Sequence, residues 1–243
     1  MGKLKFSIVI PTYNEAGGIE RLIRSLSELF TQHSLDGEII VVDDNSPDGT
    51  GAIVDRLSAE FPVRCLHRPG KLGLSSGVID GWKFARPESE ALGAMDADFS
   101  HDISIVPQMV EALEDGYGLA VGSRYVPGGG ITNWPWKRIV TSKVACMLAQ
   151  PLTRIKDITS GYLLVRRDAI EGVELDPIGF KIGLEVIAKG HYGKAIEVPY
   201  VFTDRIVGES KLNEKEIFNY LKQLRKLYAG RLFPKTQKSE SKA

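Results

Sequence analysis

Short apolar runs alternate with helix-like patterns through the first half of the chain. Four of these runs, each suited to a buried strand, occupy residues 6–10, 38–42, 63–67 and 91–95. Between them, apolar residues recur at intervals of three and four, which predicts helices at residues 19–29, 50–61 and 74–85. Strand–helix units with short connections favour a parallel sheet with helices on both faces and a ligand crevice at the carboxyl ends of the strands.

The second half follows the same pattern less regularly. Strands are predicted at residues 119–122, 163–165 and 196–202, and helices at residues 105–113, 138–149, 182–189 and 213–227. The predicted fold class is therefore α/β, with a single domain over residues 1–230. Residues 231–243 form a polar, basic tail that we expect to be disordered.

The composition is that of a soluble globular protein, with 43% hydrophobic and 26% charged residues. Lysine plus arginine equals aspartate plus glutamate, at 31 each, so the overall charge gives no argument for binding to nucleic acid. The two cysteines lie far apart and lack metal-ligand spacing, which favours a reducing, intracellular compartment. No apolar run is long enough to span a bilayer, so we expect any membrane contact to be peripheral.

Two carboxylates, Asp96 and Asp98, follow the fourth predicted strand. Only one small residue separates them, so both can offer oxygens to a single hard cation such as Mg²⁺ or Mn²⁺. Such pairs also occur at helix starts, where they cap the helix. The polar turns that begin at Pro11 and Asp43 leave strands on the same edge of the predicted sheet, and this convergence favours a site over separate turns.

Seven motifs along the chain occur in a characteristic order. They are Pro-Thr-Tyr-Asn-Glu at residues 11–15, Asp-Asp-Asn-Ser-Pro-Asp-Gly-Thr at 43–50, Lys-Leu-Gly-Leu at 71–74, Asp-Ala-Asp at 96–98, Gly-Ser-Arg-Tyr at 122–125, Thr-Ser-Gly-Tyr at 159–162 and Asp-Arg-x-x-Gly-x-Ser-Lys at 204–211. This set resembles that of the polyprenyl-phosphate (dolichyl-phosphate) mannose synthases, inverting glycosyltransferases of family 2 with the GT-A fold. The resemblance covers roughly residues 4–230. It implies that the domain 1–230 consists of a nucleotide-binding half, about 1–122, and an acceptor-binding half, 123–230.

The resemblance implies transfer of mannose from GDP-mannose with Mg²⁺ or Mn²⁺ as cofactor. Asp96 and Asp98 would be the metal ligands. Asp98, Arg124 and Arg205 would be catalytic, because a cation and fixed arginines stabilise a departing diphosphate. Some relatives carry Gln as a further metal ligand at the position of Ser100. Serine is a weaker metal ligand than glutamine, so the role of Ser100 is open. The nucleotide sugar would contact Pro11, Tyr13, Glu15, Val42, Asp44, Asp96, Ala97, Asp98, Arg124, Arg205 and Lys211.

The implied acceptor is a polyprenyl (dolichyl) monophosphate, which is anionic at neutral pH and needs little help from a general base. Its phosphate would be held by Arg124, Arg138 and Ser142, since a guanidinium binds phosphate through paired hydrogen bonds. Taken alone, Arg138 is equally consistent with a solvated residue at a helix start. Trp134 and Trp136 suit either a membrane interface or the packing of a loop.

The end of the chain adds a further sign of a membrane surface. Residues 211–243 contain nine basic and three acidic side chains, an excess that suits anionic lipid. A core-facing helix with a solvated basic side would give the same pattern. The resulting prediction is a cytoplasmic protein, peripheral on the cytoplasmic face of a membrane and held there by its own surface or by a small membrane-anchoring subunit.

Other interpretations stay open at this stage. His101 is either a second metal ligand or a residue that caps or supports the turn. The enzyme could instead transfer glucose or another hexose from a UDP-sugar to the same lipid class. A third possibility is a non-catalytic nucleotide-sugar-binding subunit of a membrane complex, although the full set of aspartates and arginines argues against it.

Overall fold

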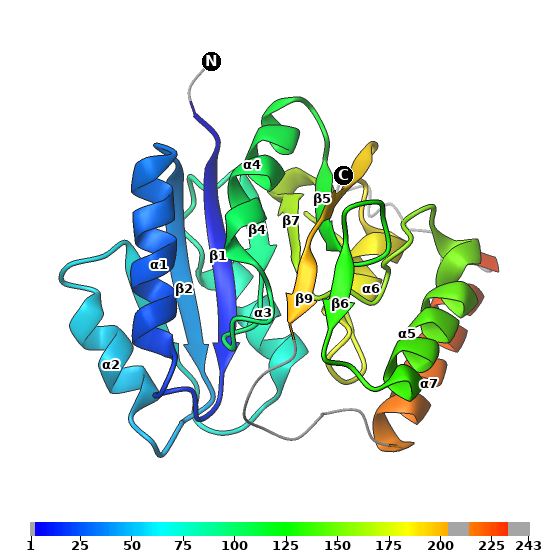
Figure 1. Ribbon diagram of the computed structural model, residues 1–243, viewed down its shortest axis with the longest axis horizontal. Coiled ribbons are helices and arrows are strands. Elements are labelled where there is room, and N and C mark those ends of the chain that lie inside the picture. Colours follow the sequence, from blue (N-terminus) through cyan, green and yellow to red (C-terminus); the bar gives the residue numbers. More distant parts are fainter. Residues whose placement is uncertain (1–2, 204–213, 233–243) are drawn as a thin grey trace, which may run out of the picture.

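The computed structural model describes residues 3–203 and 214–232. Its centre is a seven-stranded sheet in the order β3-β2-β1-β4-β7-β5-β8 (Figure 1). The strands are β1 (Lys5–Thr12), β2 (Asp36–Asp43), β3 (Val63–His67), β4 (Ala91–Ala94), β5 (Leu119–Ser123), β7 (Leu163–Arg166) and β8 (Ala195–Pro199). Neighbouring strands pair in parallel, except that β7 is antiparallel to β4 and β5. The predicted α/β class with a mostly parallel sheet is confirmed.

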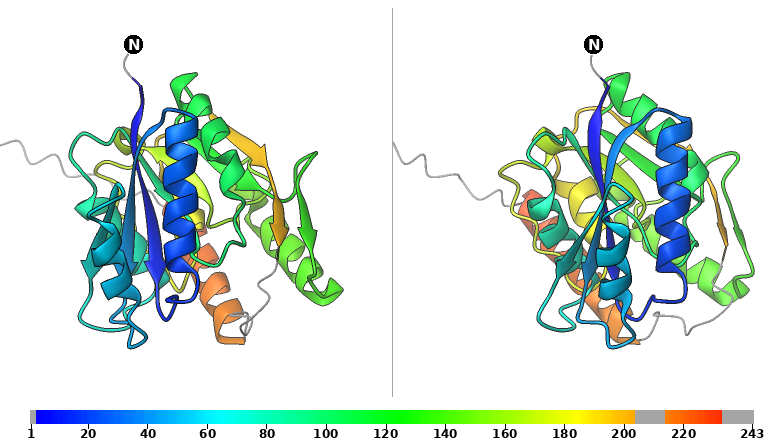
Figure 2. Two further views of the ribbon diagram at one scale, coloured as in Figure 1. Left: turned by 60° about the vertical axis from the view of Figure 1, so that its left-hand side comes forward. Right: turned by 90° about the vertical axis from the view of Figure 1, so that its left-hand side faces the viewer.

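Helices cover both faces of the sheet, as Figures 1 and 2 show. One face packs against α1 (Ile19–Gln32), α2 (Thr50–Leu57) and α4 (Val106–Glu114). The other packs against α3 (Leu74–Phe84), α5 (Trp136–Ala149), α6 (Ile182–Lys189) and α7 (Glu214–Leu232). Successive residues of a strand point to opposite faces, so Ile8 and Ile10 join the first core cluster while Val9 joins the second. Burial on both faces explains why this strand is a continuous apolar run in the sequence.

The late strand predicted at residues 196–202 is in fact two strands in two sheets. β8 pairs with β5, whereas β9 (Val201–Thr203) pairs with β6 (Gly130–Thr132) in a separate two-stranded sheet. The chain changes partner at Tyr200, whose amide donates to the Ser123 carbonyl at 3.1 Å and whose carbonyl accepts from the Gly130 amide at 3.0 Å. This change of partner brings the β6–β9 pair against the end of β5.

Helix boundaries differ most from the predictions at two places. The helix predicted at 50–61 ends at Leu57, because the chain turns there and the amides of Glu60 and Phe61 both donate to the Leu57 carbonyl. The helix predicted at 213–227 continues to Leu232, so the predicted tail begins inside it, and the rest of that tail lies outside the described residues. Within residues 3–203 and 214–232, none of the helices combines the length and apolar character needed to cross a membrane.

Candidate active site

A cavity of about 300 Å³ lies at the edge of the sheet where β1, β4 and β5 end. Helices α3, α5, α6 and α7, the segment 159–161 and strand β9 also contribute to its wall. Its volume is at the lower end of the range for small-molecule sites. Of the residues predicted for the site, the cavity brings together Pro11, Asp96, Asp98, Arg124, Arg138 and Ser142. The carboxylates of the first half and the arginines of the second therefore face the same space.

The two carboxylates lie on a tight turn directly after β4. Phe99 has a φ of +59°, a left-handed conformation that reverses the chain. The Ser100 amide donates to Asp98 Oδ1 at 3.1 Å, and the Asp96 amide donates to His101 Nδ1 at 3.0 Å. Ser100 is 1% exposed, and among the described residues its hydroxyl has no hydrogen-bond partner. The turn thus lines the cavity with two carboxylates and an unsatisfied hydroxyl oxygen.

His101 supports this turn from behind. Its ring is buried and stacks on Tyr162, with centroids 4.7 Å apart and planes within 8°. Because Nδ1 accepts the Asp96 amide, the ring proton of the neutral form is on Nε2, which lies 3.9 Å from Asp96 Oδ2. Burial lowers the pKa of His101, in spite of the opposing charges of Asp96 and Asp98. This geometry indicates that His101 is a neutral histidine that orients Asp96, and it argues against the alternative that His101 is a second metal ligand.

Arg124 is buried against a carboxylate that sequence reasoning did not single out. Its Nε and Nη2 donate to the two oxygens of Asp157 at 2.7 Å each, and Nη2 also donates to Thr159 Oγ1 at 3.0 Å. The Arg124 amide donates to the same carboxylate at 2.9 Å. Burial alone would lower the pKa of Arg124, but the hydrogen bonds and charge of Asp157 raise it above its usual range. The guanidinium is held rigidly, and its charge is balanced inside the protein.

Arg138 and the two tryptophans occupy different environments. The Arg138 guanidinium carbon lies 3.9 Å from the centre of the Trp134 ring. Trp134 packs edge-on against Phe202, with centroids 5.2 Å apart, and forms part of the cavity wall. Trp136 is 69% exposed. The sequence left two interpretations of these tryptophans, a membrane interface or the packing of a loop. Trp134 packs within a loop, whereas Trp136 lies on an open surface.

The loops predicted to bind the nucleotide are tied to each other. Three backbone amides of the loop after β1 donate to three side chains of the loop after β2, each at 3.0 Å: Asn14 to Ser46, Glu15 to Thr50 and Ala16 to Asp48. Burial would raise the pKa of Asp48, but the hydrogen bonds from Thr50 and Ala16 outweigh it and lower the pKa. The Ser-Pro-Asp-Gly-Thr motif thus joins two loops into one unit.

Asp44 is also engaged within the protein. Its Oδ2 accepts from the amides of Leu72 and Gly73 at 3.1 and 2.9 Å, and Arg68 Nη1 lies 3.0 Å from its Oδ1. These contacts connect the end of β2 to the Lys-Leu-Gly-Leu motif at residues 71–74.

The remaining predicted nucleotide residues lie outside the cavity lining. Val42 and Ala97 are buried, and Tyr13 is 37% exposed with Lys71 Nζ 3.9 Å from its ring centre. Like Glu15 and Asp44, they stay predictions for contacts with the nucleotide sugar. Arg205 and Lys211 lie outside the described residues.

Sequence reasoning missed several charged residues of the site, among them Asp157 and Lys181. Asp157 is completely buried, and its position between Ile155 and Ile158 was the only signal in the sequence. Lys181 lines the cavity at the N-terminus of α6. It precedes a predicted helix, where a lysine is normally assumed to be solvated.

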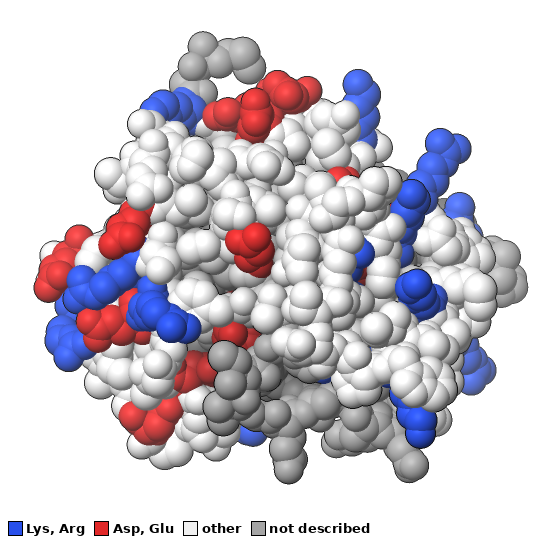
Figure 3. Space-filling model, in the orientation of Figure 1, with Lys and Arg blue, Asp and Glu red and all other residues white. Residues whose placement is uncertain are grey.

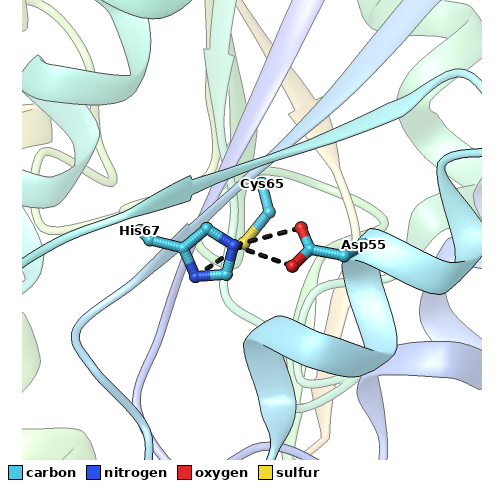
Figure 4. Close-up of side chains that lie close together, drawn as sticks. All are labelled: Asp55, Cys65 and His67. Atoms are coloured by element: carbon cyan, nitrogen blue, oxygen red, sulfur yellow. Dashed lines mark hydrogen bonds and ion pairs between the residues drawn. The ribbon is translucent and has the colours of Figure 1, made fainter.

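A second group of ligand-type side chains lies away from the cavity, between α2 and the edge strand β3 (Figure 4). His67 Nε2 is 3.0 Å from both oxygens of Asp55, and Nδ1 is 4.0 Å from Cys65 Sγ. Burial, together with Asp55 and Asp43, raises the pKa of Cys65 to about 12, so the thiol is protonated at neutral pH. Asp55 and His67 are exposed, and we interpret the group as a surface hydrogen bond between these two side chains beside a thiol.

Comparison with known proteins places this geometry in context. The family described as Glycosyl transferase family 2 matches residues 7–173. Dolichol-phosphate mannosyltransferase of Pyrococcus furiosus is 44% identical over 228 residues, which cover 92% of this chain and 64% of that protein. Polyprenol monophosphomannose synthase of Mycolicibacterium smegmatis is 38% identical over 221 residues, which cover 86% of this chain and 82% of that protein. The chain thus spans just under two thirds of the length of the Pyrococcus relative.

Solved structures show the same fold at lower sequence identity. A mannosyltransferase of Pyrobaculum calidifontis, solved in complex with GDP-Man and Mn²⁺, superimposes with a TM-score of 0.63 at 16% identity. The superposition covers 96% of this chain and 65% of that one. At this level of identity the likeness concerns the fold alone.

Proposed function

The chain belongs to glycosyl transferase family 2, and from this premise we propose that it transfers mannose, with inversion, from GDP-mannose to a polyprenyl (dolichyl) monophosphate. The names of the Pyrococcus and Mycolicibacterium relatives support both the sugar and the lipid class. The cavity offers surfaces of the kinds that such a reaction requires.

The observation that carries the proposal is the combination of surfaces around one cavity. Asp96 and Asp98 supply carboxylates, and Arg124 and Arg138 supply guanidinium groups. Helices α5 and α7 complete the wall with the apolar residues Val144, Leu148, Ile217 and Leu221. A metal-bound diphosphate, an anionic head group and an apolar tail would each meet a matching surface.

The residues present fit a divalent cation. Mg²⁺ and Mn²⁺ prefer oxygen ligands and are commonly held by one or two carboxylates together with substrate phosphates and water. Asp96 and Asp98 are the carboxylates that would hold it, and the unsatisfied Ser100 hydroxyl could accept a hydrogen bond from a metal-bound water. When bound, the cation would neutralise the charge that develops on the departing diphosphate.

In the proposed reaction, an oxygen of the acceptor phosphate attacks the anomeric carbon of mannose. A carbon–oxygen bond forms on one face while the bond to the diphosphate breaks on the other, and its electron pair leaves with GDP. The acceptor oxygen is already ionised, so no side chain has to remove a proton. Arg138 and Ser142, four residues apart on α5, share one helix face and would hold the phosphate in line. Arg124, fixed by Asp157, would keep the head group from rotating.

A panel of donors tests the sugar and the base. With a short polyprenyl phosphate as acceptor, we expect release of GDP from GDP-mannose to exceed release of UDP from UDP-glucose by about a hundredfold or more. The measurement is initial rates of nucleoside diphosphate release, with acceptor omitted as the control. Preference for UDP-glucose would favour the hexosyl transferase instead. Absence of turnover with every donor, combined with normal nucleotide binding, would favour a non-catalytic binding subunit.

We also propose that the exposed face of α5 and α7 contacts a membrane. The large apolar side chains exposed on these two helices are Trp136, Val140, Val144, Met147, Leu148, Ile217, Phe218 and Leu221. The helices lie side by side, joined where the Tyr220 and Tyr228 hydroxyls donate to carbonyls of α5. The α5 sequence has three basic residues and no acidic one, and in Figure 3 the right-hand edge over α5 shows basic side chains without acidic neighbours. Attachment to the cytoplasmic face and an anchoring subunit stay predictions.

Vesicle binding tests this face. Replacing Trp136 and Phe218 together by serine is expected to weaken binding to vesicles that contain anionic phospholipid by on the order of tenfold or more, since both side chains would otherwise be buried in lipid. Cosedimentation measures it. Leu72→Ser is the matched control, because Leu72 is 57% exposed but lies on another part of the surface. Equal losses in both variants would contradict a dedicated membrane face.

A further inference from the structure

Lys181 is a basic residue of the cavity wall that the proposed reaction has not used; the wall also includes the acidic residue Glu216. It stands immediately before α6 and lines the cavity together with Arg124, Arg138 and Asp96. Its side chain is partly buried, and its Nζ lies 4.7 Å from the centre of the Phe180 ring. Among the described residues, its ammonium group experiences burial and the charges of Arg124, Asp157 and Asp96, without a side-chain hydrogen bond. A lysine with an apolar neighbour and no carboxylate partner is costly unless an anion accompanies it.

The charge balance around Lys181 points in the same direction. Arg124 is matched by the fully buried Asp157, with which it shares two hydrogen bonds. The pair together is neutral, so it attracts an incoming anion less than an isolated arginine would. Burial, followed by repulsion from Arg124, lowers the pKa of Lys181 to about 8, so the ammonium is still mostly protonated at neutral pH. The charges of Asp157 and Asp96 oppose this shift without outweighing burial, so Lys181 is a second cation of the cavity wall beside Arg138.

The position of Lys181 associates it with the acceptor side of the cavity. Its carbonyl accepts from Gln223 of α7 at 3.4 Å, and the next residue, Ile182, belongs to the core cluster that includes residues of α5 and α7. The tied loops after β1 and β2 belong to the other end of the sheet edge, on β1 and β2. An anion beside Lys181 would therefore lie near the helices whose apolar residues line the cavity.

We propose that Lys181 binds the phosphate of the polyprenyl phosphate acceptor together with Arg138, with the Arg124–Asp157 pair as the rigid wall of that subsite. This inference rests on the proposed function for the identity of the ligand. The inference is that Lys181 binds the acceptor and does not bind the donor. A purely structural role of Lys181 would affect the binding of both substrates.

The test compares Lys181→Met, Lys181→Arg and the wild type, with farnesyl phosphate as the acceptor. Lys181→Met is expected to raise the KM for farnesyl phosphate by about tenfold to a hundredfold, the usual effect of losing a charged hydrogen bond. The KM for GDP-mannose should stay within about twofold, and Lys181→Arg should recover most of the acceptor affinity because it keeps the charge. Lys83→Met, at an exposed lysine of α3, is the matched control.

Measuring the binding of farnesyl phosphate directly tests the role of Lys181 independently of the proposed mannose transfer. Farnesyl phosphate should bind the wild type more tightly than farnesol does, and Lys181→Met should remove that difference while GDP binding shows that the variant is folded. If the wild type binds farnesyl phosphate but transfers no mannose, the proposed function fails and the binding result alone decides the role of Lys181. Equal farnesyl phosphate affinity in Lys181→Met and wild type, or a matching rise in the KM for GDP-mannose, overturns the inference. So does a wild type that does not bind farnesyl phosphate.

Discussion

Replacing Asp98 by alanine is expected to lower kcat by on the order of a thousandfold, the largest effect on turnover that we expect from one side chain. Asp98 lines the cavity, and its Oδ1 is fixed by the Ser100 amide. Without this carboxylate, a divalent cation would keep only Asp96 as a protein ligand and would no longer stabilise the departing diphosphate. The measurement is kcat at saturating GDP-mannose, acceptor and metal ion.

Two further measurements show whether the loss comes from the metal. GDP binding in the presence of Mn²⁺ should weaken in Asp98→Ala, whereas binding in EDTA should be the same as in the wild type. Asp102→Asn is the matched control, since Asp102 is an exposed residue of the same loop and the amide can still cap the Ser104 amide. Retention of kcat within about tenfold, or GDP binding by the wild type that ignores Mn²⁺, would contradict the assignment.

Replacing Asp157 by alanine is expected to lower the free energy of unfolding by about 3–5 kcal/mol. The side chain is completely buried and accepts hydrogen bonds from the Arg124 side chain and amide. Its removal would leave the buried guanidinium of Arg124 without a counter-charge. An unpaired buried charge destabilises the folded state strongly, whereas replacing both charged residues by apolar ones is often nearly neutral. Urea unfolding of the two proteins at neutral pH, followed by tryptophan fluorescence, measures the difference.

An exposed aspartate provides the comparison for this stability effect. The Asp168 side chain is 77% exposed and lies 4.0 Å from Arg166, so Asp168→Ala is expected to change stability by no more than about 0.5 kcal/mol. The double variant Arg124→Met, Asp157→Leu should recover much of the stability lost in Asp157→Ala, because it removes both charges. A loss below about 1 kcal/mol in Asp157→Ala would mean that water or another group compensates Arg124.

The fold could be predicted where local pattern and tertiary structure agree. The apolar run at residues 38–42 is buried on both faces in β2, and the helix predicted at 182–189 has those bounds in the structure. The change of strand partner at Tyr200 could not be predicted, since β8 and β9 form one continuous β-like run and their partners lie more than 60 residues away. Partner choice is a tertiary property that a local pattern does not contain.

The site shows the same division. Asp96 and Asp98 could be placed because a carboxylate pair after a buried strand must emerge at the sheet edge. Asp157 could not, because its role depends on Arg124, which is 33 residues away in sequence. Lys181 could not be predicted as a site residue either. Its position in the cavity wall and the pairing of Arg124 with Asp157 are both known only from the structure.

The hydrogen bonds that tie the loop after β1 to the loop after β2 have a consequence for ligand affinity. They order both loops when the protein folds, so the conformational entropy of this surface is lost at folding and, under the proposed function, before nucleotide binding. A nucleotide that meets a preorganised surface does not have to spend its binding free energy on ordering it. The Ser-Pro-Asp-Gly-Thr motif therefore fixes the shape of this surface through residues that need not touch a ligand themselves.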